Sequence, residues 1–229
     1  MSLQDIVDSA SEIVTDRRKQ SASVVTRSGV LRTTTMLGHA PWLFTITFNK
    51  SLKYSTNRDL IEEIDRLGIT EEETINIGNS NPNLAYITRY RGNASTASLN
   101  SITLLDNANA RGVLLANCSS VTGSTGFLFR AGDYVQPRGN TNGYRHPYTV
   151  TADITLSSAA GNSNVSIPVN RRTFEQPNVT IVGYGITWGA NVTWPVKMLN
   201  KPKYAILPYD RVVFTEDFQL LEVMKDFYE

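Results

Sequence analysis

The sequence predicts a mainly β protein with two short helices, in which a β-barrel or β-sandwich core carries a small inserted β domain and an N-terminal helix. Three observations predict this class. Over Trp42–Asn49 the sequence has a period of two, in which one face is apolar and rich in aromatic residues and the other face is Leu43, Thr45, Thr47 and Asn49. Short β-like segments recur about every ten residues between positions 102 and 192, and Gly, Asn and Pro lie between them. Strands at this spacing are typical of a small sandwich or barrel.

Residues 1–20 are predicted to form an N-terminal docking helix. Apolar residues there follow the i, i+3, i+4, i+7 spacing of one helix face, and Ser2 is a suitable N-cap. The face consists of Leu3, Ile6, Val7, Ala10, Ile13 and Val14. Because so short a helix is marginal alone, the face has to pack on the chain's own domain or on a neighbouring subunit.

The remaining pattern divides the chain into a discontinuous core and an insertion. The core is predicted from residues 21–100 plus 195–229, and the inserted β domain from residues 101–194. In the core, Val24–Leu37 and Trp42–Phe48 are expected strands, followed by a helix over Asn57–Leu67. Tyr204–Phe214 and Phe218–Met224 are strand-like, so we expect the C-terminal end to be held in a sheet.

The composition argues against several functional classes. Lys and Arg number 22 against 21 Asp and Glu, and no long basic run occurs, so specific nucleic-acid binding is not expected. Cys118 is the only cysteine, so no intrachain disulfide can form. Neither a signal peptide nor an apolar run of about 20 residues is recognisable. We therefore expect synthesis in a host cytoplasm and no membrane partner.

No catalytic, cofactor-binding or metal-ligating motif stands out. His39 and His146 lie far apart without an HExxH pattern, and residues 123–126 lack the frame of a phosphate-binding loop. A glycoside hydrolase needs two carboxylates about 5–9.5 Å apart. Candidates without specific spacing are Asp133, Asp153, Asp210 and Glu216. We expect a protein that is not an enzyme and needs no cofactor or metal.

Two groups of residues in the insertion suggest recognition. Arginine and tyrosine are enriched at protein interfaces, and they gather at Arg130, Tyr134, Arg138, Tyr144 and Arg145. The alternative is that these arginines are ordinary surface cations. Trp188 and Trp194 could stack on a sugar or a partner if exposed, and core packing is their alternative role. Together with Leu3, Ile6, Val7 and Ile13, these residues form the candidate interface.

Three segments carry a resemblance to a known family. The segments are Phe127–Gln136 (FLFRAGDYVQ), Tyr148–Ile154 (YTVTADI) and Val165–Val169 (VSIPV). Their order and composition resemble a recurring signature of bacteriophage tail proteins, and over roughly residues 24–224 the chain looks like the distal-tail or tail-hub group of baseplate proteins. The N-terminal helix is not part of that signature.

The resemblance implies a tail-tube-related β-barrel core and a structural role in the virion tail. It implies a homo-oligomeric ring, a trimer or hexamer, at the tail tube end, which joins the tube to baseplate or fibre proteins; head-to-tail interfaces that close generate such rings. Two alternatives stay open. One is a virion receptor-binding or carbohydrate-binding module with a shallow aromatic groove, and the other is a tail terminator or connector at the head-proximal end.

Overall fold

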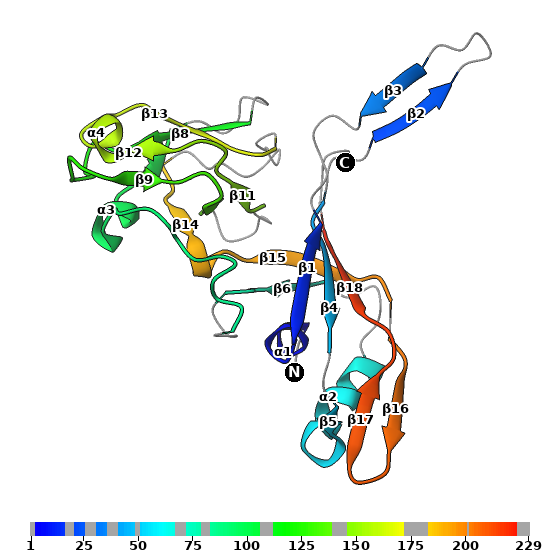
Figure 1. Ribbon diagram of the computed structural model, residues 1–229. Coiled ribbons are helices and arrows are strands. Elements are labelled where there is room, and N and C mark those ends of the chain that lie inside the picture. Colours follow the sequence, from blue (N-terminus) through cyan, green and yellow to red (C-terminus); the bar gives the residue numbers. More distant parts are fainter. Residues whose placement is uncertain are drawn as a thin grey trace.

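The computed structural model shows a mainly β protein with several small sheets and a few short helices (Figure 1), as the sequence predicts. It describes residues 3–16, 21–25, 31–35, 41–48, 51–66, 72–78, 83–105, 112–138, 146–171, 183–200 and 202–223. Within these ranges no sheet closes into a barrel. None of the helices found there has the length and apolar character of a membrane-spanning segment.

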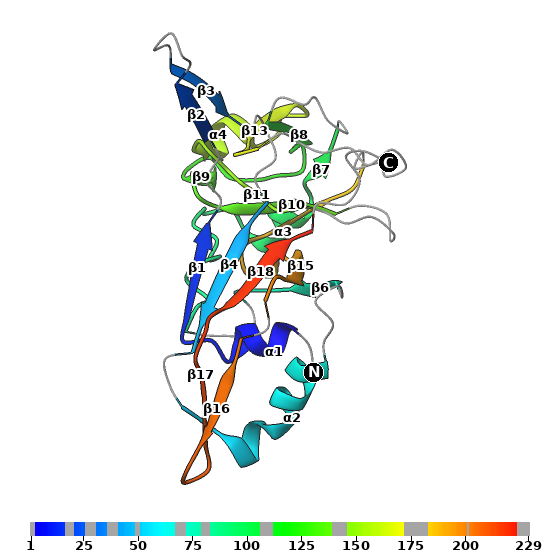
Figure 2. The same ribbon diagram turned by 90° about the vertical axis from the view of Figure 1, so that its right-hand side faces the viewer.

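The largest sheet is antiparallel and has five strands in the order β1-β4-β18-β15-β6 (Figure 2). The strands are β1 (Glu12–Asp16), β4 (Leu43–Thr47), β18 (Phe218–Glu222), β15 (Trp194–Met198) and β6 (Glu72–Ile75). In β4 the predicted alternation holds, because Phe44 and Ile46 are buried while their neighbours are only partly buried. The C-terminal strand β18 lies at the centre of the sheet, as expected for an end held in place.

An aromatic cluster fills the first core beneath this sheet. The Trp42 indole lies 6.0 Å from the Trp194 ring and 5.8 Å from the Tyr134 ring, measured between centroids. Helix α2 (Tyr54–Arg66) adds three buried residues on one face to the same core, namely Leu60, Ile61 and Ile64. The spacing of these three residues is the pattern from which the helix was predicted. The helix begins three residues earlier than expected, and its predicted end at Leu67 lies outside the described residues.

The N-terminal helix is shorter than predicted. Helix α1 covers only Leu3–Asp8, and β1 follows after a short turn. Ile13 and Val14 therefore lie on an edge strand, where β-branched side chains fit well and the backbone pairs with β4. The prediction of a helix over residues 1–20 is therefore wrong for Glu12–Asp16, and residues 17–20 lie outside the described part of the chain. Leu3, Ile6 and Val7 are buried in the first core, so α1 packs on its own domain.

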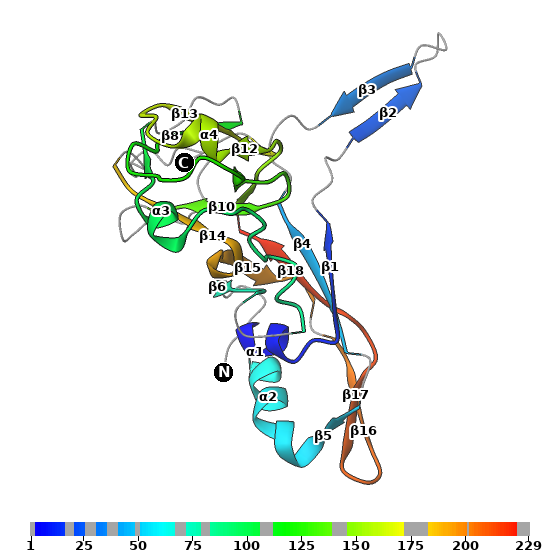
Figure 3. The ribbon, with the colours of Figure 1, turned by 60° about the vertical axis from the view of Figure 1, so that its left-hand side comes forward.

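Two hairpins extend from opposite ends of the molecule in all three ribbon views (Figures 1–3). One consists of β2 (Ser21–Val25) and β3 (Leu31–Thr35), which pair only with each other among the described strands. The other consists of β16 (Tyr204–Leu207) and β17 (Arg211–Phe214), with β5 (Leu52–Lys53) beside β17. The sequence predicts one extended segment over Val24–Leu37 and another over Tyr204–Phe214. Both regions contain an antiparallel hairpin instead.

The chain between β6 and β15 builds a second hydrophobic core (Figure 3). Its strands are β7 (Thr103–Leu104), β8 (Val113–Asn117), β9 (Phe127–Phe129), β10 (Tyr134–Pro137), β11 (Tyr148–Thr149), β12 (Ile154–Thr155), β13 (Val165–Pro168) and β14 (Ile186–Trp188). The short helices α3 (Thr96–Asn100) and α4 (Leu156–Ala159) were not predicted, and Ser95 and Thr155 cap them. A 3-10 turn, η1 (Gly189–Asn191), leads back to β15.

Candidate functional site

Five of the predicted interface residues lie inside the first core. They are Leu3, Ile6, Val7, Tyr134 and Trp194, with exposed fractions of 0–8%. Tyr134 comes from β10 of the insertion, but its ring packs against Trp42 and Trp194. These side chains stabilise the fold and do not lie on a surface that a partner could contact.

Six predicted interface residues remain: Arg138 is exposed, three others are partly buried (Ile13, Arg130 and Trp188), and two lie outside the described part of the chain. Arg138 is exposed, donates to Thr187 and Asn100, and holds its guanidinium 5.9 Å from the Trp188 ring centroid. Arg130 lies over the Phe127 ring at 4.5 Å. Ile13 is half-buried on β1. Tyr144 and Arg145 lie outside the described residues, as does His39, which was not an interface candidate.

The three signature segments converge on one turn of the second core. Gly132 adopts a positive φ of 98° at this turn, a conformation that favours glycine. The buried Asp133 carboxylate accepts the backbone N–H of Arg130 at 2.8 Å and that of Arg91 at 2.9 Å. Burial raises the pKa of Asp133, and these two N–H donors oppose that rise.

The other two segments complete this turn from the outside. The Asp153 carboxylate accepts the N–H of Ala131 at 2.8 Å. Backbone bonds join Gly132 to Val150 and Thr151 to Pro168. The residues that carry the family resemblance therefore form one structural unit. In it, the candidate catalytic carboxylates Asp133 and Asp153 accept hydrogen bonds from backbone N–H groups and hold the turn in place.

A buried ion cluster joins the two cores. Glu222 on β18 is completely buried, and each of its carboxylate oxygens accepts from the Arg171 guanidinium at 2.8 Å. The Nδ1 atom of His146 lies 3.1 Å from one of these oxygens, and the Trp42 backbone N–H donates to the other at 3.1 Å. Arg171 also donates to the Pro147 carbonyl. The insertion is thus tied to the central strand of the first sheet.

The electrostatics of Glu222 follow from this pairing. Burial alone would raise the pKa of the carboxyl, but the charge and hydrogen bonds of Arg171, together with the His146 contact, lower it to about 2. The sequence held a signal for this site. Phe218, Leu220 and Glu222 share the inward face of one strand, and a carboxylate at an inward position needs a buried partner.

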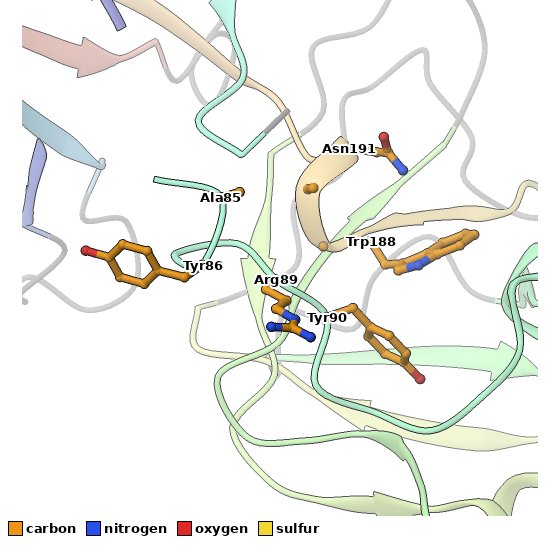
Figure 4. Close-up of a pocket in the computed structure, with 8 residues that line it drawn as sticks. Ala85, Tyr86, Arg89, Tyr90, Trp188 and Asn191 are labelled. Atoms are coloured by element: carbon orange, nitrogen blue, oxygen red, sulfur yellow. The ribbon is translucent and has the colours of Figure 1, made fainter. Parts of the chain in front are cut away.

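A pocket of about 580 Å³ lies where the two connections between the cores meet (Figure 4). Tyr86, Arg89 and Tyr90 come from the outgoing connection, and Trp188 and Asn191 come from the returning one. Trp188 was a predicted recognition residue, whereas the tyrosines and Arg89 were not singled out. They lie in a polar stretch whose spacing shows no periodic pattern.

No protein-family model matches this chain, and no curated protein matches it. Among the residues that the structure describes, no group of His, Cys, Asp and Glu side chains could hold a metal ion. Cys118 is buried, and burial raises the pKa of its thiol to about 11.

The two edges of the five-stranded sheet differ. At the β6 edge, the Gln4 side-chain amide of α1 accepts from the Asn76 N–H at 2.6 Å and donates to the Asn76 carbonyl at 2.7 Å. Helix α1 therefore covers the end of this edge. The other edge is β1, which no described strand pairs on its outer side, and its Val14 side chain is 50% exposed.

The β16–β17 hairpin carries an exposed apolar tip. Ile206, Leu207 and Tyr209 are 59%, 42% and 94% exposed, and Tyr209 and Asp210 both have positive φ angles. The Asp210 carboxylate accepts the N–H of Ser55 at 2.7 Å and so caps α2 from a distant part of the chain. Asp210 was not predicted as a cap of this helix, because the turn at 208–210 was not recognised.

Proposed function

We propose that this protein is a structural, non-enzymatic component of a bacteriophage tail baseplate or hub. Copies would form a closed ring of three or six subunits at the end of the tail tube and link the tube to baseplate or fibre proteins. Two observations carry the assembly part of this proposal, namely the β2–β3 hairpin, which pairs with no other described strand, and the open β1 edge. The location in a virion tail rests on the resemblance.

The β2–β3 hairpin has no third strand among the described strands. Its two strands pair only with each other among the described strands, and they extend away from both cores in Figure 1. A two-stranded hairpin on its own is marginally stable in water, whereas a third strand or a packing surface makes it stable. We infer that the surface is provided by a second copy of this chain.

Docking of the β2–β3 hairpin on a second copy would be a head-to-tail contact, the kind of interface that can close into a ring. The hairpin of one subunit and its receiving surface on the next are different patches, so the interface is heterologous, and a rotation that closes gives a ring. The β6 edge is partly covered by α1, so pairing of β1 with β6 of a neighbour would displace the Gln4 bonds. We favour hairpin docking over such edge pairing. In this proposal the first core corresponds to the barrel of tail-tube-related proteins.

The candidate carboxylates support a non-enzymatic role. Asp133, Asp153 and Asp210 accept backbone N–H groups, and Glu216 pairs with Lys203 at 3.8 Å on the surface. The receptor-binding alternative is weakened because Trp194 is buried. A terminator or connector at the head-proximal end would use the same ring geometry, and only its position in a virion would differ.

The mass of the purified chain tests ring assembly. Native mass spectrometry should give a single species of three or six copies. A variant in which residues 21–35 are replaced by a short Gly-Ser linker should be monomeric while keeping the circular dichroism of a β protein. Tyr209→Ser, at the other hairpin, serves as the control and should leave the mass unchanged. A monomeric wild-type chain, or a linker variant that still forms the ring, would contradict hairpin docking.

A further inference from the structure

We propose that the tip of the β16–β17 hairpin inserts into the interface of a lipid bilayer that carries anionic headgroups. The tip consists of residues 206–211, all of which are exposed. The turn between β16 and β17 forms one extremity of the molecule in all three ribbon views (Figures 1–3), and no other described element projects beyond it at this end. The proposal does not rest on ring assembly, because the tip belongs to a single chain.

The apolar side chains of the tip are not covered by the described part of the chain. Ile206 and Leu207 are 59% and 42% exposed, and Tyr209 is 94% exposed. Three of the seven large hydrophobic side chains that are exposed among the described residues therefore lie within four positions of one another. Apolar side chains that gather on a surface mark a contact with another apolar phase. A convex tip of this kind suits a fluid bilayer, which needs no preformed groove.

The turn holds Tyr209 outward at a conformational cost. Tyr209 and Asp210 have φ angles of 65° and 60°, which glycine and asparagine adopt more readily than tyrosine. Helix α2 secures this conformation, because the Ser55 N–H donates to the Asp210 carboxylate at 2.7 Å and the Tyr54 N–H donates to the Asp210 carbonyl at 3.0 Å. Strained residues of this kind concentrate at functional sites. A tyrosine held outward in this way serves contact with a partner, because glycine or asparagine would suffice to reverse the chain.

Two cations lie behind the apolar tip on one face of the three-stranded sheet. The strand register places Leu207 opposite Arg211 and Arg211 opposite Lys53, so the three residues form one row across β16, β17 and β5. Arg211 and Lys53 are both exposed, and the Asp210 carboxylate near Lys53 is engaged by Ser55. Like charges directly opposite each other in a sheet are unfavourable, and the anionic headgroups of a bilayer would offset this repulsion. This charge complementarity favours an anionic lipid surface as the occupant.

The acidic side chains at this end set the depth of the contact. Asp59, Glu62 and Asp65 line one hollow on α2, and the Asp65 carboxylate accepts the Tyr204 hydroxyl at 2.8 Å. Tyr204 lies three residues from Leu207 along β16, which places this contact roughly 10 Å behind the end of the strand. Interfacial segments enter a bilayer by about 5–10 Å, so the tip can insert while Asp65 stays in water.

An interfacial contact is compatible with the absence of a long apolar run. Sequence analysis predicts no membrane partner on the ground that no run of about 20 apolar residues occurs, but that argument concerns spanning segments. A hairpin tip buries only a few side chains, and tyrosine is enriched at the level of the headgroups because its ring is apolar and its hydroxyl is polar. Tyr209 is suited to this position.

Vesicle flotation of the full-length chain tests the proposal. The probes are vesicles of phosphatidylglycerol and phosphatidylcholine in equal parts, with pure phosphatidylcholine vesicles as the neutral comparison. The wild type should float with the anionic vesicles. Lys53→Gln and Arg211→Gln should each weaken binding about fivefold, the loss expected for one basic residue at an anionic surface. Tyr209→Ser should weaken it about tenfold or more, because the apolar ring is lost.

A matched control and a second measurement locate the contact. Tyr86→Ser removes a tyrosine that is 72% exposed outside the tip and should leave binding unchanged. Tyr209→Ser is expected to keep the subunit mass of the wild type, so loss of vesicle binding at constant mass separates the tip from ring assembly. Anionic vesicles should slow amide hydrogen exchange over residues 204–212 and leave the β2–β3 hairpin unchanged.

Three outcomes would overturn the proposal. They are the absence of flotation with anionic vesicles, equal binding to neutral vesicles, and equal binding by wild type and Tyr209→Ser. The first of these outcomes would assign the tip to an apolar groove on another protein. Slower exchange confined to other segments would place the lipid contact elsewhere and also reject the tip.

Discussion

The Glu222 carboxylate and the Arg171 guanidinium form two parallel hydrogen bonds of 2.8 Å, and through them strand β18 holds the inserted module. The two residues are 51 positions apart; Glu222 lies on β18 of the five-stranded sheet, and Arg171 follows β13 of the second core. A buried carboxylate in this setting is tolerated only while its partners remain. The contact between the two cores therefore includes this buried polar cluster as well as the Tyr134 ring.

Removing one member of this pair should be strongly destabilising. Glu222→Ala leaves the Arg171 charge buried without its carboxylate and should lower the free energy of unfolding by about 3–5 kcal/mol. Chemical denaturation followed by tryptophan fluorescence measures the change. Glu216→Gln, which removes an exposed carboxylate, is the control and should change stability little. The double variant Glu222→Leu with Arg171→Met should be more stable than Glu222→Ala; equal loss in both would argue against an uncompensated charge.

Stability should also fall in acid over a defined range. The pKa of Glu222 is lowered from 4.5 to about 2, so the unfolded chain binds the proton more readily than the folded one. The stabilisation is complete above about pH 4.5 and is lost as the pH falls towards 2. Denaturation curves of the wild type and Glu222→Gln at several pH values should converge in this range. A constant difference between the two proteins would contradict the assignment.

The turn at Asp133 should control the order of the second core. Asp133→Ala leaves the N–H groups of Arg91 and Arg130 without their acceptor, at a cost of about 1–3 kcal/mol for each buried group. Amide exchange should rise around residues 127–135 and 148–155, with less change in β4 and β18. Asp133→Asn keeps a carbonyl oxygen and should be milder. Equal protection in wild type and Asp133→Ala would show that the turn forms without these bonds.

Asp210 should fix the start of α2. Its carboxylate accepts from the Ser55 N–H and hydroxyl, which lowers the pKa of Asp210, and Asp210→Ala removes this cap. We expect faster amide exchange in the first turn of α2, while residues 60–66 keep their protection. Asp217→Ala, also exposed, is the matched control. An unchanged first turn would mean that the hairpin does not hold the helix.

The parts of the fold that local pattern could predict are those with a regular period. Strand β4 and helix α2 each bury one face, and their periods of two and 3.6 are visible without structure. The β16–β17 hairpin was missed although Pro208 and Asp210 interrupt the apolar run, because its turn needs positive φ angles at Tyr209 and Asp210, which non-glycine residues seldom adopt. Helix α1 was extended too far because Ile13 and Val14 fit the helical spacing but pair with β4.

The candidate site was harder to predict because it depends on long-range contacts. Tyr134 and Trp194 were interpreted as interface residues on their type, but aromatic residues are common in cores and interfaces alike, and burial decides between them. The pairing of Glu222 with Arg171 and His146 joins three distant segments. An inward-facing glutamate indicates that a partner exists, but the sequence does not show which one.

Immunogold electron microscopy tests the central claim most directly. An antibody against the purified chain would be applied to virions from a culture that expresses it. The proposal predicts label confined to the far end of the tail tube. Label at the head-proximal end, at fibre tips or on no particle would contradict it, and label at fibre tips would favour a receptor-binding role.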